Sequence, residues 1–123
     1  MEKEFCSYEQ ALALKELGFD EPCFGFYYPN GKLINIVTTG FPDDKKDCVF
    51  APLYQQAFRW FRDKYGLEGV TQRAEDFMWY KWTIHQYNEN SKKYVANWYK
   101  YKTYEEAELE CLKKLIEIVK EQK

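Results

Sequence analysis

The residues best suited to do chemistry are concentrated between positions 77 and 102. This segment contains nine aromatic residues and five lysines but a single acid, Glu89. Its stretch FMWYKWTIHQY, residues 77–87, also holds the only histidine of the chain, His85. Aromatic faces beside lysines on antiparallel strands can stack bases, and tyrosine and tryptophan are also frequent anchors of protein interfaces. The segment therefore predicts a binding surface.

Alternation along a strand separates the rings of the core from those of the predicted surface. If residues 76–87 form a strand, one face is apolar and is expected to be the core face: Met78, Tyr80, Trp82 and Ile84. The opposite face is mixed: Phe77, Trp79, Lys81, Thr83, His85 and Tyr87. With the next strand included, the residues expected to contact a ligand or partner are Trp79, Lys81, His85, Tyr94, Trp98 and Lys100.

A catalytic interpretation depends on His85, because imidazole can act as a general base near neutral pH. On its own strand no Asp or Glu alternates with His85 to orient the ring. We therefore predict no catalytic residue and no cofactor. A small enzyme with His85 or Cys48 as its reactive group is the alternative.

The sequence also predicts no metal site. Cys6, Cys23, Cys48 and Cys111 form no C-x-x-C pair, whereas zinc sites usually take their ligands in close pairs. We expect four reduced, structural thiols. The run DDKKD at 43–47 lacks the alternating ligands and glycine of a calcium loop, and the six glycines never cluster into a phosphate-binding loop.

Helix signals occur at both ends and in the middle of the chain. Ser7 and Gln10 predict a capping box for a helix over 8–17, which Gly18 ends and after which Phe19 folds back on Leu14. A second helix is expected from Pro52 to Gly66. A third follows the capping box of Thr103 and Glu106, with the expected buried stripe Tyr104, Ala107, Cys111, Leu112, Leu115, Ile118 and Val119.

Strand signals fill the intervals. Aromatic and β-branched runs on either side of PNGK predict a hairpin with strands at 22–28 and 33–38. A loop is expected at 39–50. Three more strands are expected at 69–73, 76–87 and 93–102.

These elements predict an α+β fold as a single domain over residues 1–123. The expected architecture is an antiparallel or mixed sheet of four to five strands, with three helices packed mainly on one face in the order α-β-β-α-β-β-β-α. No apolar run approaches the ~20 residues of a membrane span, and the first residues do not read as a signal peptide. We expect a cytoplasmic protein with no membrane partner.

Three stretches carry a resemblance to a known group of proteins: YEQALALKELGFDEPCFGFY, APLYQQAFRWFRDKYGL and YEEAELECLKKLIEIVKE. They resemble a family of small uncharacterised proteins encoded by bacteriophages and prophages of gut bacteria. The resemblance covers about half of the chain and implies a phage accessory protein expressed in a bacterial cytoplasm. It implies no activity, ligand or catalytic residue.

Together these features predict a non-enzymatic binding protein that uses an aromatic and lysine-bearing sheet face. A protein partner or a homodimer is favoured over nucleic acid, because the net charge of the chain is -2. The alternative for the same face is sequestration of a nucleotide or a single-stranded nucleic acid.

Overall fold

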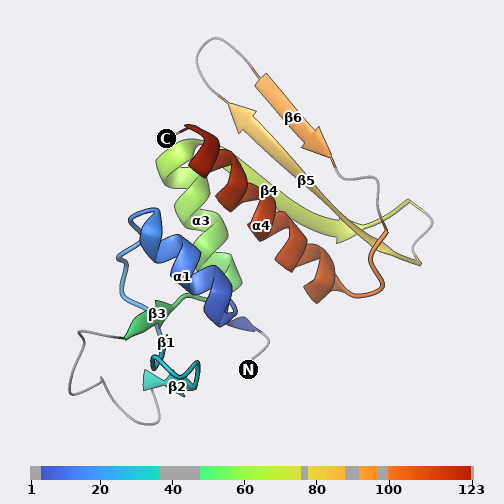
Figure 1. Cartoon of the computed structure of the whole chain (residues 1–123). Helices are drawn as coiled ribbons and strands as arrows, with labels where there is room; N and C mark the ends of the chain where they lie inside the picture. The colour runs from blue at the N-terminus through green and yellow to red at the C-terminus, as the bar shows by residue number, and fades with distance from the viewer. Residues whose placement is uncertain (1–3, 37–47, 76–77, 88–91, 97–99, 123) are drawn as a thin grey trace. The chain divides into compact units, whose positions relative to one another are not determined.

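The computed structural model describes residues 4–36, 48–75, 78–87, 92–96 and 100–122 (Figure 1). Within them lie three helices and six strands: α1 (Tyr8–Glu16), β1 (Gly25–Tyr27), β2 (Leu33–Asn35), β3 (Val49–Ala51), α3 (Tyr54–Tyr65), β4 (Leu67–Arg73), β5 (Tyr80–Tyr87), β6 (Lys92–Ala96) and α4 (Tyr104–Gln122). The α+β class is confirmed. The strands form two antiparallel sheets, β2-β1-β3 and β4-β5-β6.

The chain divides into two compact units, residues 1–54 and 55–123, which we call the first and second unit. The β2-β1-β3 sheet belongs to the first unit and the β4-β5-β6 sheet to the second. Whether the units make one domain stays a prediction. In the described part of the chain, no helix has the length and apolarity needed to cross a membrane.

The ends of α1 follow the predicted signals only in part. Gly18 has φ 100°, and the Phe19 amide donates to the Leu14 carbonyl at 3.0 Å, so the helix ends in the predicted left-handed cap. Ser7 is at the N-cap, but its side chain makes no capping hydrogen bond, so the capping box predicted there is wrong. At α4 the Glu106 amide does donate to Thr103 Oγ1, at 3.1 Å.

The PNGK hairpin forms as predicted, with shorter strands. Gly31 has φ 86°, and the amide of Tyr28 donates to the Lys32 carbonyl at 3.1 Å to close the turn. The third strand of this sheet, β3, lies at the end of the segment predicted to be a loop. It pairs antiparallel with β1, with Phe50 opposite Phe26. Because β1 and β3 are far apart in the sequence, no local turn signal could predict this pairing.

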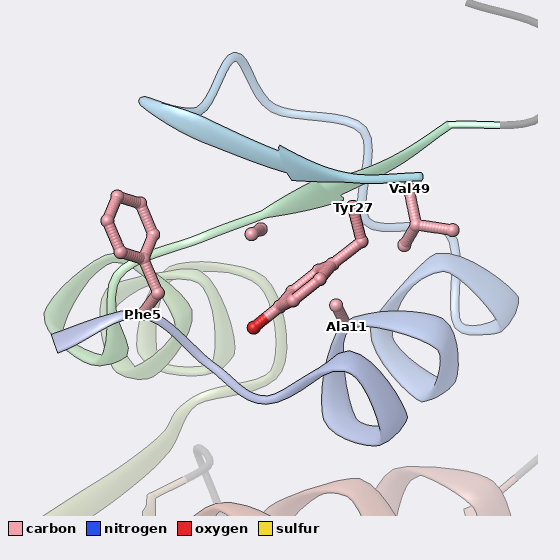
Figure 2. Close-up of a cluster of buried hydrophobic side chains, with 5 residues drawn as sticks. Phe5, Ala11, Tyr27 and Val49 are labelled. Carbon is pink, nitrogen blue, oxygen red and sulfur yellow. The ribbon is translucent and has the colours of Figure 1, made fainter. Parts of the chain in front are cut away.

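The first unit has its own core between α1 and the sheet. Phe5, Ala11, Tyr27, Val49 and Ala51 are buried together. Figure 2 shows Phe5, Tyr27 and Ala11 gathered on the α1 side of the sheet. The Tyr27 hydroxyl donates to the Cys6 carbonyl at 2.7 Å, which satisfies its polar atom in this apolar setting.

The second unit packs α4 along β4 and β5 (Figure 1). The helix and strand approach each other closely at Gly69, where a Cβ added to the glycine would lie 2.9 Å from Cys111 Sγ and 3.1 Å from Leu115 Cδ1. Phe58 of α3 reaches the same place, with its Cδ1 3.2 Å from that Cβ position. Glycine is therefore required here by the close approach of helix and strand.

Three predicted burials differ in the structure. Met78 was expected in the core, but it precedes β5 and is 74% exposed. Tyr104 begins α4 and is 42% exposed, although its ring contacts that of Tyr80 at the start of β5. Ile118 is only half-buried, whereas Ile116 is buried.

Candidate functional site

The sheet of the second unit has a helix-covered face and an outer face. Gly69 faces α4, and Ile84 is its direct partner on β5, so both lie on the covered face. Because side chains alternate along each strand, the other face carries the intervening residues. We call this the outer face; its members on β4 and β5 are Glu68, Val70, Gln72, Lys81, Thr83 and His85.

His85 lies at the centre of one row of the outer face. Its direct partner on β4 is Glu68, and its direct partner on β6 is Tyr94. Cβ atoms of directly opposed residues are about 4.5–5.5 Å apart, so the Glu68 carboxylate is within reach of the imidazole. Sequence reasoning missed Glu68, because only the register between strands brings it beside His85.

The next positions of the outer face are less open than predicted. Lys81 makes an ion pair with Glu75, and the exposed fraction of its side chain is 23%. Thr83, predicted on the open mixed face, is buried at 6% exposure in the central strand. Its neighbours across the ladder are Val70 and Ala96. This part of the face therefore offers little unpaired positive charge.

The remaining predicted site residues are placed at the margin of the sheet. Trp79 is half-buried, and its carbonyl accepts from the Ala74 amide at 2.8 Å where β4 turns towards β5. Lys100 is exposed and precedes Tyr101, which forms a bridge with Tyr80. Trp98 lies outside the described residues.

An aromatic cluster lies at the α4 N-terminal end of the second unit. The Tyr80 ring meets the Tyr104 ring edge-on at 5.9 Å, and the Arg73 guanidinium lies 5.0 Å from the Tyr80 ring centre. Burial raises the pKa of the Tyr104 phenol, and Glu108 raises it further. The phenol therefore remains a neutral hydrogen-bonding group at physiological pH, and the cluster serves as packing with one cation–π contact.

The buried thiol of the second unit is not suited to nucleophilic chemistry. Burial raises the pKa of the Cys111 thiol to about 12, and the nearby Glu108 carboxylate adds to the shift. A backbone hydrogen bond with Val70 acts in the opposite direction. Since the thiolate is the reactive form of cysteine, Cys111 is inert near neutral pH.

This shift predicts a pH dependence of stability. The folded pKa of about 12 lies above the ordinary value of 9.0, so the neutral thiol stabilises the fold below pH 9 and this contribution is lost as pH rises towards 12. Relative to Cys111→Ala, the wild-type free energy of unfolding should fall by ~2 kcal/mol between pH 8 and 10.5. Urea denaturation at both pH values measures the difference. Parallel pH profiles for the two chains would contradict it.

The two residues of the enzyme alternative lie in different units of the chain. Cys48 is half-buried in the first unit, whereas His85 is half-buried in the second. All four cysteines are free thiols. Among the residues that the structure describes, no group of three His, Cys, Asp or Glu side chains could hold a metal ion.

Comparison with known proteins adds no further constraint. The sequence matches no protein-family model, and no curated protein or solved structure is significantly similar to it. The function is therefore inferred from the geometry of the chain itself.

Proposed function

We propose that this protein is a non-enzymatic binding protein, in the role of a phage accessory protein, and that the outer face of β4-β5-β6 binds a protein partner or a second copy of the chain. The observation that supports this is the difference between the two faces of the sheet. The covered face supplies the core, with Trp82 4% and Ile84 1% exposed. The outer face carries an imidazole and a carboxylate in one row.

The mixed charge of the outer face favours a protein partner over a nucleic acid. Lys81 is paired with Glu75, and Glu68 lies directly opposite His85. A groove for single-stranded nucleic acid uses unpaired cations along the phosphates, and two carboxylates at this surface oppose that. A protein interface tolerates alternating charges, because complementary groups on the partner can pair with them.

The position of Glu68 directly opposite His85 in the β4-β5 register also supports a second candidate, an enzyme with His85 as general base. A carboxylate beside imidazole can orient the ring and stabilise its protonated form. Any activity of this kind should be lost in His85→Asn and reduced in Glu68→Gln, with folding unchanged by circular dichroism. A binding role predicts that both variants change affinity alone.

The binding proposal predicts that Trp79→Ser combined with Trp98→Ser weakens association at least ~30-fold with little effect on folding, because aromatic anchors contribute ~2 kcal/mol or more each. Self-association is measured by sedimentation velocity, and association with a host protein by quantifying what co-purifies with each variant from the same expression host. Fluorescence anisotropy with an oligothymidine probe measures the nucleic-acid alternative, which also requires a steep loss of affinity with salt.

Met78→Ser is the matched control. Met78 is next to Trp79 in the chain and is 74% exposed, but it is not one of the predicted contact residues. It should leave association unchanged. Wild-type association in the double tryptophan variant would refute the proposal. Unfolding of the double variant would show that the rings belong to the core.

A further inference from the structure

The turn between β1 and β2 contains the only Asn-Gly pair of the chain, Asn30 and Gly31. In such a pair the backbone nitrogen of the glycine can attack the side-chain amide of the asparagine, because glycine has no side chain that would block the approach. Asn30 is exposed. Among the described residues beyond its chain neighbours, no atom would lie within 4 Å of a Cβ added to Gly31. The pair is therefore open to solvent and has room to react.

Three hydrogen bonds between residues 28 and 32 close this turn. The Gly31 amide donates to the Tyr28 carbonyl at 2.8 Å, and the Tyr28 amide donates to the Lys32 carbonyl at 3.1 Å. The Lys32 amide donates to Asn30 Oδ1 at 2.9 Å. With the φ of 86° at Gly31, this is the pattern of a type I turn followed by a left-handed glycine. Both groups that would react, the Gly31 amide and the Asn30 side chain, are thus engaged in the closed turn.

The closed turn also keeps the reacting atoms apart. The second central residue of a type I turn, here Asn30, has a ψ of about 0°. At this angle the Gly31 nitrogen is turned away from the Asn30 side chain, and a five-membered ring can close only after a large rotation about the Cα–C bond of Asn30. That rotation breaks the hydrogen bond from Gly31 to Tyr28. The reaction therefore requires the turn to open.

We infer that Asn30 is a site of self-modification, and that opening of the β1-β2 turn controls its rate. In the open turn, hydroxide removes the Gly31 amide proton and the nitrogen attacks Asn30 Cγ. The new N–Cγ bond closes a succinimide ring, the Cγ–Nδ2 bond breaks, and the departing nitrogen takes a proton from water and leaves as ammonia.

Water then opens the ring, because its hydroxyl adds to one carbonyl carbon and its proton goes to the ring nitrogen. Attack at Cγ leaves an aspartate at position 30. Attack at the backbone carbonyl carbon of Asn30 leaves an isoaspartate, whose main chain runs through Cγ. Neither step needs an oxidant, a metal or an enzyme.

The isoaspartate product cannot re-form the same turn. Its main chain has one additional carbon atom before Gly31, so the Tyr28 and Lys32 backbone groups no longer match. The Tyr8 hydroxyl of α1 donates to the Pro29 carbonyl at 3.5 Å, so a contact between the helix and the turn is also affected. Opening of the hairpin thereby becomes irreversible. This inference does not depend on the function proposed for the outer face.

Peptide mapping by mass spectrometry of the full chain, stored at mildly alkaline pH, measures the reaction as a gain of one mass unit at Asn30. Asn35 is the internal control, because the β-branched side chain of Ile36 shields the next amide, and it should stay unmodified in the folded chain. In guanidinium chloride the rate at Asn30 should rise at least ~10-fold, since the hydrogen bonds of the turn no longer have to open first.

Pro29→Ala tests the control by the turn. Proline presets the first central position of the turn, so its removal should speed the modification of the folded chain by roughly 2–5-fold and leave the rate in guanidinium chloride unchanged. Asn30→Gln is the negative control, because its side chain would have to close a larger ring, and position 30 should then stay unmodified. Circular dichroism of both variants checks that the chain is folded.

Asn30→Asp is the matched control for the product. It has the charge of the isoaspartate form without the additional main-chain carbon. Ion exchange separates the isoaspartate form from the unmodified chain. Hydrogen exchange at the Tyr28 amide should be faster in the isoaspartate form than in Asn30→Asp, because only the former loses the bond to the Lys32 carbonyl.

Several results would overturn the inference. An unmodified Asn30 in the unfolded chain would remove the site. An equal or faster rate in the folded chain, or no effect of Pro29→Ala, would show that the turn does not control the reaction. Equal exchange at Tyr28 in the isoaspartate form and in Asn30→Asp would show that the hairpin closes again after the modification.

Discussion

Leu115→Ala should lower the free energy of unfolding by ~2–5 kcal/mol, a large share of the ~5–15 kcal/mol typical of a domain. Leu115 is fully buried on α4, and its Cδ1 lies against Gly69 of β4. Truncation removes apolar contact and leaves a cavity that the sheet cannot fill, because backbone lies on the other side. Urea denaturation followed by near-ultraviolet circular dichroism measures the loss.

Two further variants of the second unit provide a comparison for this result. Phe58→Ala should cost less than Leu115→Ala, because Phe58 is half-buried although it reaches the same contact. Lys113→Ala, on the exposed side of α4, removes an ion pair with Glu110 at 3.1 Å and should change stability by less than ~1 kcal/mol. A loss below about 1 kcal/mol for both Leu115→Ala and Phe58→Ala would show that the helix faces are misassigned.

Gly69→Ala should destabilise the second unit by ~1–3 kcal/mol, and Gly69→Val by more. The added Cβ would lie 2.9 Å from Cys111 Sγ, which is on a short side chain and cannot swing away. α4 must therefore move away from β4 to accept it. Chemical denaturation of the single variants provides the measurement.

Combining Gly69→Ala with Cys111→Ala tests whether this contact is the cause. Removal of Sγ opens the space that the new methyl group needs, so the double variant should be more stable than the sum of the two single losses predicts, by ~0.5 kcal/mol or more. Gly25→Ala is the control, because its Cβ would meet the Phe5 ring at 2.8 Å in the first unit. Cys111→Ala should not relieve that clash. Strict additivity at Gly69 would contradict the proposed close approach.

Local signals determined much of the fold, because their physics depends on neighbouring residues alone. Gly18 and Gly31 take the positive φ angles that a helix end and a tight turn require, and both were predicted from sequence. The stripe of α4 was predicted in the same way, with Leu115 and Cys111 fully buried as expected. The α+β class follows from the order of these elements.

The tertiary structure decided which of these residues meet. Glu68 and His85 are 17 positions apart in sequence, and only the β4-β5 register makes them direct partners. Phe26 and Phe50 likewise lie opposite each other because β3 pairs with β1 across a long connection. The tertiary structure also decides which side chains are exposed. Met78 continues the alternation of the core face, but it precedes β5 and is exposed to solvent. Alternation tells which residues share a side of a strand, but pairing and coverage by a helix decide which side is buried, and these depend on contacts between residues far apart in the chain.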